Sequence, residues 1–210
     1  MKVLIAGCSL AGLATALSLV TKFEDKKKMT KENVDSKQDN DDDGRNSIKI
    51  LIVERRGQLN SRGATFGLAK NGQIALREIS PPHVLRQLLD DFGINMPFTD
   101  GHMLPWWPVR DGLLRCVREE SPYKETISVH LGCVIKEVLE EDENVPLKIS
   151  FEASRASTNP TGGSDDKESG TIIPPDQDFD LLIGADGMHS QIRTRVLQCP
   201  PPIYTDVFVW

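Results

Sequence analysis

The sequence predicts an α/β domain built on a parallel sheet, and three observations lead to this fold class. An apolar run at Val3, Leu4 and Ile5 passes through a glycine turn into apolar residues at helical spacing. A second run, 48–53, is continuously apolar, as expected of a strand buried on both faces. A third run, 181–183, ends in a Gly-Ala-Asp-Gly turn. Strands that alternate with helical segments favour parallel pairing.

The turn after the first strand holds Gly7, Ser9 and Gly12, which is the G-x-G-x-x-G pattern with serine at its middle position. In a dinucleotide site the first glycine permits a tight turn, the second position lets the backbone approach a pyrophosphate, and the third packs helix on strand. The helix N-terminus adds unpaired N–H groups and a positive dipole end. A short glycine pattern is weak evidence by itself, so the later segments decide its meaning.

A signal peptide, a membrane span and a lipoprotein cleavage box at Ile5-Ala6-Gly7-Cys8 compete for the first twenty residues. The apolar or small residues before Cys8 are only those at 3–7, fewer than the roughly 7–15 of a signal peptide's apolar region. Glycine and serine at turn-like positions disfavour a span. We therefore expect no membrane span and a cytoplasmic protein.

The second strand ends in Glu54. In a βαβ nucleotide unit, an acidic residue at this place accepts hydrogen bonds from ribose hydroxyls, about 20 residues beyond the glycines. The interval is longer here because the polar segment 21–47 intervenes. That segment is dense in charge of both signs and is expected to be a disordered insert. A strand-end charge facing water is the competing interpretation of Glu54, and the glycine turn upstream favours ribose binding.

Further helices are predicted over 71–79 and 83–89, where apolar residues recur and Pro81 and Pro82 separate the two. A strand is expected over 103–109, and its tryptophan pair is interpreted as part of the core in preference to a stacking platform. Asp111 is expected to cap the helix that follows.

Three strands, 127–131, 134–139 and 147–151, are predicted to form a β-meander. The second polar insert, 153–177, is expected to be a loop or disordered. Arg62, in the glycine-rich loop after the second strand, is either a phosphate or flavin contact or an exposed loop side chain.

The last strand leads into Asp186 and Gly187 and then into the start of a helix. Open α/β sheets place ligands at such turns, beyond the carboxyl ends of their strands. A simple turn is the competing interpretation of Asp186 beside Gly187. His189 is interpreted as a surface histidine.

Charge and cysteine content exclude several classes of function. The net charge is −6 and no basic stripe stands out, which disfavours nucleic-acid binding. The cysteines are scattered, without a C-x-x-C pair or a neighbouring histidine cluster. We therefore expect no metal site and no disulfide framework, and a reducing compartment.

In their order along the chain, these segments resemble the FAD-dependent aromatic-ring monooxygenases, the para-hydroxybenzoate hydroxylase-like flavoproteins. The matching parts are IAGCSLAGLATALSL, IVERR, RGATFGLAKNGQIALREI, VRDGLLRCV and DLLIGADGMHSQIR. The last looks like the family's DG motif and is the most specific. The resemblance implies a Rossmann-like FAD-binding domain with a parallel sheet, helices and a β-meander.

The resemblance also implies roles for individual residues. Gly7, Ser9, Ala11 and Gly12 would line the FAD pyrophosphate, and Glu54 would hold the adenosine ribose. Arg55 and Arg110 would flank the flavin nucleotide, with Val134 near the adenine. Asp186 and Gly187 would serve both FAD and the passing NAD(P)H.

The function implied is an NAD(P)H-dependent monooxygenase that hydroxylates or epoxidises a small organic substrate, an aromatic one being favoured. Its chemistry belongs to a flavin hydroperoxide, so no protein acid, base or nucleophile is expected. The family's second Gly-Asp motif does not follow Gly187. We therefore expect an FAD-binding domain over 1–200 and the start of a truncated substrate domain over 201–210.

Two alternatives stay open. One is a non-catalytic, truncated module that binds flavin or another nucleotide. The other is an NAD-linked dehydrogenase, which would share the first βαβ unit and would have no need of the DG motif.

Overall fold

A parallel sheet forms the centre of the computed structural model, which describes residues 1–32, 47–60, 64–96, 100–139, 145–154 and 172–200. Its strands are β1 (Lys2–Ala6), β2 (Lys49–Glu54), β6 (Ile127–Leu131) and β10 (Leu181–Gly184), in the order β10-β1-β2-β6. All three pairings are parallel, and Ile5 lies between Ile52 and Ile183. The parallel sheet predicted from the sequence is confirmed.

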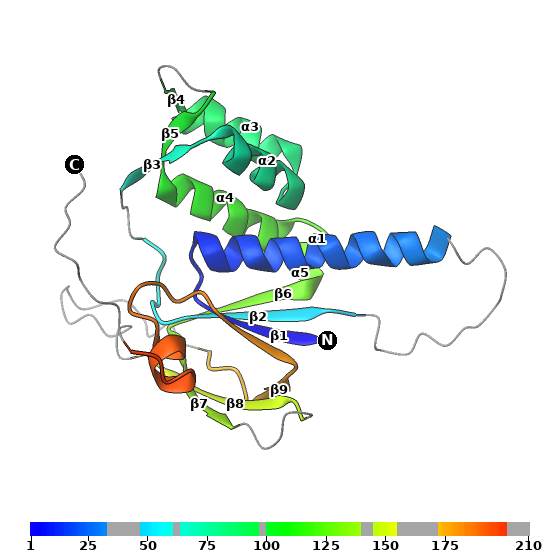
Figure 1. The fold of residues 1–210 in the computed structure, drawn as a ribbon, viewed down its shortest axis with the longest axis vertical. Coiled ribbons are helices and arrows are strands. Elements are labelled where there is room, and N and C mark those ends of the chain that lie inside the picture. Colours follow the sequence, from blue (N-terminus) through cyan, green and yellow to red (C-terminus); the bar gives the residue numbers. More distant parts are fainter. Residues whose placement is uncertain (33–46, 61–63, 97–99, 140–144, 155–171, 201–210) are drawn as a thin grey trace, which may run out of the picture.

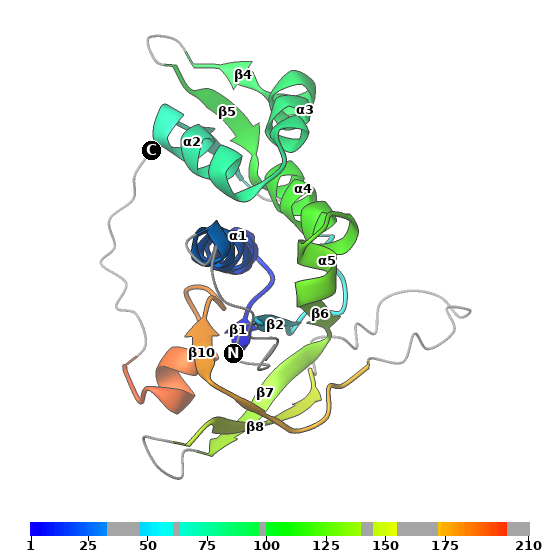
Figure 2. The ribbon, with the colours of Figure 1, turned by 90° about the vertical axis from the view of Figure 1, so that its right-hand side faces the viewer.

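The two faces of the sheet are covered by different layers (Figures 1 and 2). Helices α1 (Leu10–Glu32) and α4 (Trp106–Glu119) cover one face, and the antiparallel meander β7 (Cys133–Leu139), β8 (Leu147–Ala153) and β9 (Gln177–Phe179) covers the other. Side chains alternate along each strand. Val3 and Ile5 accordingly join the helix-side core, while Leu4 and Ala6 pack with the meander.

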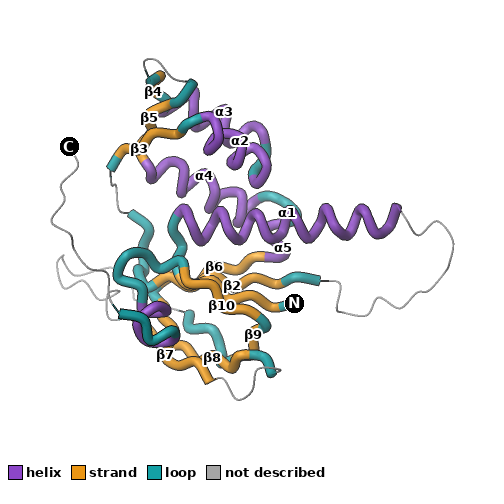
Figure 3. The backbone as a smooth tube through the Cα atoms, viewed as in Figure 1, coloured by secondary structure: helices purple, strands orange, loops and turns teal. Residues whose placement is uncertain are grey.

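A smaller layer lies beyond α1 and α4 (Figure 3). It holds the antiparallel strands β3 (Thr65–Leu68), β4 (Ile94–Asn95) and β5 (His102–Pro105), with helices α2 (Lys70–Ile79) and α3 (Pro82–Phe92). The predicted helices over 71–79 and 83–89 are therefore confirmed. The short helix α5 (Tyr123–Thr126) and the π-helical turn η3 (Ile192–Val196) complete the described elements.

The first helix corrects the predicted start of the polar insert at Thr21, because α1 continues to Glu32. Phe23 still packs against the helix-side core, and the Thr21 hydroxyl donates to the Leu17 carbonyl oxygen at 2.9 Å. The residues beyond are mostly Lys, Glu and Met, which favour helix without burial. Figure 1 shows this half of α1 extending past the end of the sheet.

Two further predictions are corrected. The strand expected over 103–109 is β5 only as far as Pro105, and α4 begins at Trp106, so Asp111 lies inside the helix and is not its cap. Pro108 falls in the first helical turn, where proline is tolerated. The strand expected over 127–131 is β6 of the parallel sheet, and β9 takes its place in the meander.

Some expectations fall outside the described residues: Arg62, the parts 33–46 and 155–171 of the two polar inserts, and the segment 201–210. At the borders of the second insert, Ala153 ends β8 and Gln177 begins β9. None of the helices in the described ranges is both long and apolar enough to cross a membrane.

Candidate functional site

A cavity of about 650 Å³ lies at the carboxyl ends of β1, β2 and β10 and extends to α4 and β7. Ligand sites of small molecules commonly enclose about 300–1,000 Å³. Of the residues that the family resemblance implied for the site, all except Gly12 line this cavity. These lining residues are Gly7, Ser9, Ala11, Glu54, Arg55, Arg110, Val134, Asp186 and Gly187.

The turn between β1 and α1 depends on two glycines. Gly7 has a φ of 112°, and its N–H donates to the Val53 carbonyl oxygen at 2.8 Å. A Cβ atom on Gly7 would lie 2.3 Å from the carbonyl oxygen of Ala185, which follows β10. A side chain at Gly7 would therefore be strained and would separate the two turns that form the cavity floor.

The N-terminus of α1 opens into the cavity through Ser9 and Ala11, which are both exposed. The Ser9 carbonyl oxygen accepts the N–H of Leu13 at 3.0 Å, which begins the helical hydrogen bonds. The first turn of α1 contains no acidic residue to oppose a bound anion. The exposed position of Ser9 explains how serine replaces the middle glycine of the motif without a clash.

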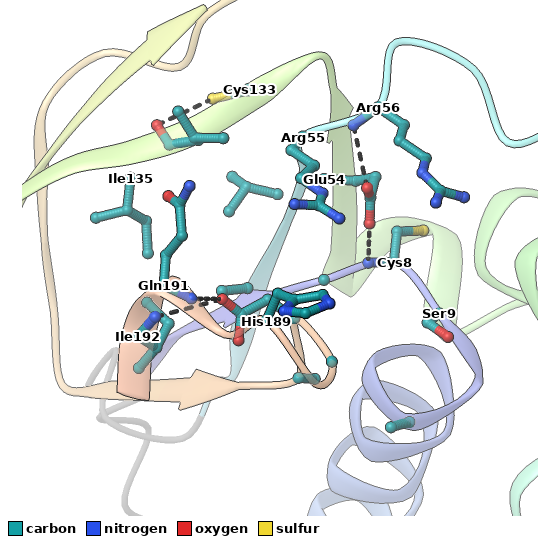
Figure 4. Close-up of a pocket in the computed structure, with 18 of the residues that line it drawn as sticks. Cys8, Ser9, Glu54, Arg55, Arg56, Cys133, Ile135, His189, Gln191 and Ile192 are labelled. Carbon is teal, nitrogen blue, oxygen red and sulfur yellow. Dashed lines mark hydrogen bonds between the residues drawn. The ribbon is translucent and has the colours of Figure 1, made fainter. Parts of the chain in front are cut away.

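Glu54 connects the first two turns of the site (Figure 4). Its Oε2 accepts the backbone N–H of Cys8, and its Oε1 accepts the backbone N–H of Arg56, each at 3.0 Å. The carboxylate is therefore fixed between the β1–α1 turn and the segment after β2. Each oxygen has a second lone pair, so the carboxylate can accept further hydrogen bonds from a ligand.

Asp186 organises the turn after β10, where Gly187 has a φ of 83°. Asp186 Oδ2 accepts the backbone N–H of Gln191 at 2.6 Å and that of Ile192 at 3.3 Å (Figure 4). In the described part of the chain, the buried Asp186 Oδ1 has no hydrogen-bond partner. Asp186 also lines the cavity, and a buried carboxylate oxygen without a partner is suited to a ligand hydroxyl or N–H.

The remaining predicted residues come from elements distant in sequence. Arg110 on α4 is only 3% exposed, and its Nε donates to Asp111 Oδ1 at 2.8 Å. Its Nη2 donates to the Leu59 carbonyl oxygen. Val134 lies on β7, at the opposite wall, while Arg55 is exposed just after β2. The structure thus brings residues of the β1–α1 turn, the end of β2, α4, β7 and the turn after β10 to one cavity.

The cavity wall has more cationic than anionic side chains, although the protein as a whole is acidic. The cationic lining residues are Arg55, Arg56, Arg110, Lys136 and Arg195, and the anionic ones are Glu54, Glu137 and Asp186. The chain carries a net charge of −6. A locally cationic cavity in an acidic protein favours an anionic ligand.

The two thiols at the site are buried, and burial raises their pKa values. Burial, with a smaller contribution from Glu54, raises the pKa of Cys8 to about 12, and burial raises that of Cys133 to about 11. Both line the cavity, and both stay protonated near neutral pH, so neither is a nucleophile. All four cysteines are free, and the described residues contain no group of His, Cys, Asp or Glu suited to a metal ion.

Sequence reasoning missed several residues of the cavity wall, among them Trp106, Lys136, Gln191 and Arg195. Trp106 was expected in the core because an aromatic pair is more often core than a stacking platform. His189 is exposed, as expected of a surface histidine, yet it also lines the cavity (Figure 4). Gln191 follows the Gly-Ala-Asp-Gly turn by only four residues, and this proximity is the signal that could have identified it.

No protein-family model and no curated protein matches the sequence. Solved structures do match the fold. PqsL, a probable FAD-dependent monooxygenase from Pseudomonas aeruginosa, aligns over 96% of this chain with a TM-score of 0.58 and 16% identity. CtdE, solved in complex with FAD, aligns over 92% with a TM-score of 0.58 and 14% identity. The chain has the fold of the FAD-dependent monooxygenases.

This chain corresponds to less than half of the length of these solved proteins. The chain spans 46% of PqsL and 40% of CtdE. A third similar structure, the tetracycline destructase Tet(51), aligns over 93% of this chain and 41% of its own, with a TM-score of 0.57 and 14% identity. The family resemblance in the motifs and the likeness in fold therefore agree.

Proposed function

We propose that this chain binds FAD in the cavity at the carboxyl ends of β1, β2 and β10. It would be the FAD-binding domain of an NAD(P)H-dependent flavoprotein monooxygenase that hydroxylates or epoxidises a small organic substrate, with an aromatic one favoured. The proposal rests on one observation. The α1 N-terminus, the Glu54 carboxylate and the turn that contains Asp186 all line the same cavity.

The chemistry of these elements fits the parts of FAD. A pyrophosphate suits the α1 N-terminus, which opens through the exposed Ser9 and Ala11 into a cavity with a mostly cationic wall. Glu54 can accept hydrogen bonds from ribose hydroxyls. Asp186 Oδ1 lacks a partner in the described chain and can accept a hydrogen bond from a hydroxyl of the flavin nucleotide. Arg55, Arg110 and Val134 would complete the walls.

In such enzymes the bound flavin supplies the redox chemistry and oxygen transfer, and NAD(P)H is the proposed reductant. The residues of this chain would bind and orient the nucleotide and keep water from its buried end. No side chain of the cavity is assigned as an acid, base or nucleophile. The high pKa of the Cys8 thiol, about 12, agrees with a passive role for this thiol.

Flavin content tests the proposal. The chain would be expressed and purified, its cofactor released by heat, and the released compound identified by absorbance and chromatography. We expect near-stoichiometric FAD that falls sharply in Glu54→Gln. A folded chain that stays empty when FAD is added would contradict the proposal. Binding of NADH in place of FAD would favour the dehydrogenase interpretation.

The non-catalytic alternative predicts a different result in a second assay. A chain that binds FAD tightly but oxidises no NADH or NADPH, with or without added aromatic compounds, would be a binding module. Oxygen-dependent oxidation of NAD(P)H that Glu54→Gln abolishes would support the enzyme.

A further inference from the structure

Trp106 and Arg110 lie one turn apart on α4, and their side chains contact each other at the wall of the site cavity. Arg110 Cζ lies 4.8 Å from the centroid of the Trp106 ring, within the range of a cation–π interaction. Residues four positions apart share a helix face, and long side chains lean towards the N-terminus, so Arg110 reaches back over Trp106. Both residues line the cavity.

The guanidinium of Arg110 is almost wholly removed from water, and its surroundings must compensate. One donor goes to the Leu59 carbonyl oxygen, and the Asp111 carboxylate accepts another. The Asp111 side chain is 48% exposed, so water weakens that ion pair. The face of the Trp106 ring provides a favourable contact that does not depend on solvent-exposed charge.

We propose that Trp106 is a positioning residue that holds the Arg110 guanidinium at the cavity wall, in the orientation in which it binds the flavin nucleotide. The proposal deepens the proposed function and rests on it for the identity of the ligand. A guanidinium held flat by a ring has fewer orientations to lose on binding an anionic oxygen. Trp106 would therefore increase FAD affinity through Arg110.

The adjacent Trp107 offers a matched control. It packs edge-to-face on Phe92 of α3, with ring centroids 5.4 Å apart and an interplanar angle of 71°. Trp107 is not among the described residues that line the cavity. The same substitution at Trp107 thus removes an indole from the same helical turn without touching the Arg110 contact that we assign.

The first test needs no bound ligand. In the purified chain, the Arg110 Nε–H signal in NMR, assigned by its loss in Arg110→Lys, reports how well the guanidinium is held. We expect its hydrogen exchange to become about tenfold faster in Trp106→Leu, less so in Trp106→Phe, and to stay unchanged in Trp107→Leu. Equal acceleration in Trp106→Leu and Trp107→Leu, or none in either, would overturn the positioning role.

The second test measures FAD affinity in a double-mutant cycle. Trp106→Leu should weaken FAD binding about tenfold, Trp106→Phe should retain part of the affinity, and Trp107→Leu should retain all of it. In an Arg110→Met background, Trp106→Leu should cause little further loss, because both changes remove the same interaction. Effects that add would overturn the coupling between the two residues.

The two tests separate this inference from the proposed function. A wild-type chain that binds no FAD would contradict the proposed function, while the exchange of the Arg110 Nε–H still decides whether Trp106 holds the guanidinium. Unchanged FAD affinity in Trp106→Leu would overturn the inference and leave the proposed function in place.

Discussion

Gly12 packs directly against Gly7 across the first turn of α1. A Cβ atom on Gly12 would lie 1.9 Å from the Gly7 carbonyl oxygen and 3.4 Å from Ile5 Cγ2. The helix therefore rests on the backbone of the turn that begins it. This explains why Gly12 does not line the cavity and yet belongs to the site, since its role is to set the distance between helix and strand.

Gly12→Ala should both destabilise the fold and weaken FAD binding. The atom that the new methyl group meets belongs to the backbone, so the turn and the helix must separate, at a cost of about 1–3 kcal/mol in the free energy of unfolding. Chemical denaturation and FAD titration measure the two effects. FAD affinity equal to that of the wild type would contradict this account of the turn.

Gly72→Ala is the matched control for that substitution. A Cβ atom there would lie 2.7 Å from Leu68 Cδ1, which is the end of a flexible side chain. Alanine also favours helix over glycine by about 1 kcal/mol, which offsets the crowding in α2. We expect nearly unchanged stability and unchanged FAD affinity.

Glu54→Gln should lower FAD affinity at least tenfold and reduce the free energy of unfolding by about 1–3 kcal/mol. The amide can accept one of the backbone N–H groups, from Cys8 or Arg56, but its NH₂ group then faces the other. Isothermal titration with FAD and urea denaturation would measure the two losses. Glu125→Gln, an exposed position on α5, provides the same change of charge away from the cavity and should alter neither quantity.

The parts of the site that could be predicted from the sequence are those whose function depends on local backbone geometry. Gly7 and Gly187 adopt positive φ, and Glu54 stands at the end of an apolar strand. Each leaves a pattern in a few consecutive residues. Because the strands that precede them are parallel, their carboxyl ends meet at one edge of the sheet. Their proximity in space followed from the fold class.

Other features depended on packing between distant segments and could not be derived locally. The sequence of the short strand β6 does not indicate which strand it pairs with. It pairs with β2 because Ile127 and Val129 extend the helix-side core. The start of α4 was misplaced because prolines flank Trp106 and Trp107, although proline is compatible with a first helical turn. Consequently, only the structure shows that Trp106 lines the cavity.

Asp186→Asn should weaken FAD binding about tenfold with little change in the stability of the free chain. The Asn oxygen can still accept the N–H groups of Gln191 and Ile192, so the turn keeps its hydrogen bonds. The NH₂ group then replaces Oδ1 and can only donate, which removes the acceptor that we assign to a ligand hydroxyl.

The rise in melting temperature on addition of FAD reports that loss, because a ligand stabilises the native state in proportion to its binding free energy. Asp186→Ala should lose the turn's hydrogen bonds as well and melt at a lower temperature even without FAD. An unchanged shift in Asp186→Asn would show that Oδ1 does not contact the ligand.

Thiol reactivity should divide the four cysteines into one reactive residue and three protected ones. Cys199 is exposed, whereas Cys8, Cys116 and Cys133 are buried. Burial raises the pKa of Cys8 to about 12, and those of Cys116 and Cys133 to about 11. At pH 8 a disulfide reagent should therefore modify Cys199 rapidly in the native chain, and Cys199→Ser should remove that fast phase.

The same pKa values predict how stability depends on pH. In the unfolded chain these thiols lose their protons near pH 9, while in the native state they keep them to about pH 11 or 12. Between these limits the native state binds more protons than the unfolded state, so the free energy of unfolding falls as pH rises above 9. Cys8→Ala should reduce that slope in urea denaturation, and an unchanged slope would show that the Cys8 thiol is accessible to water.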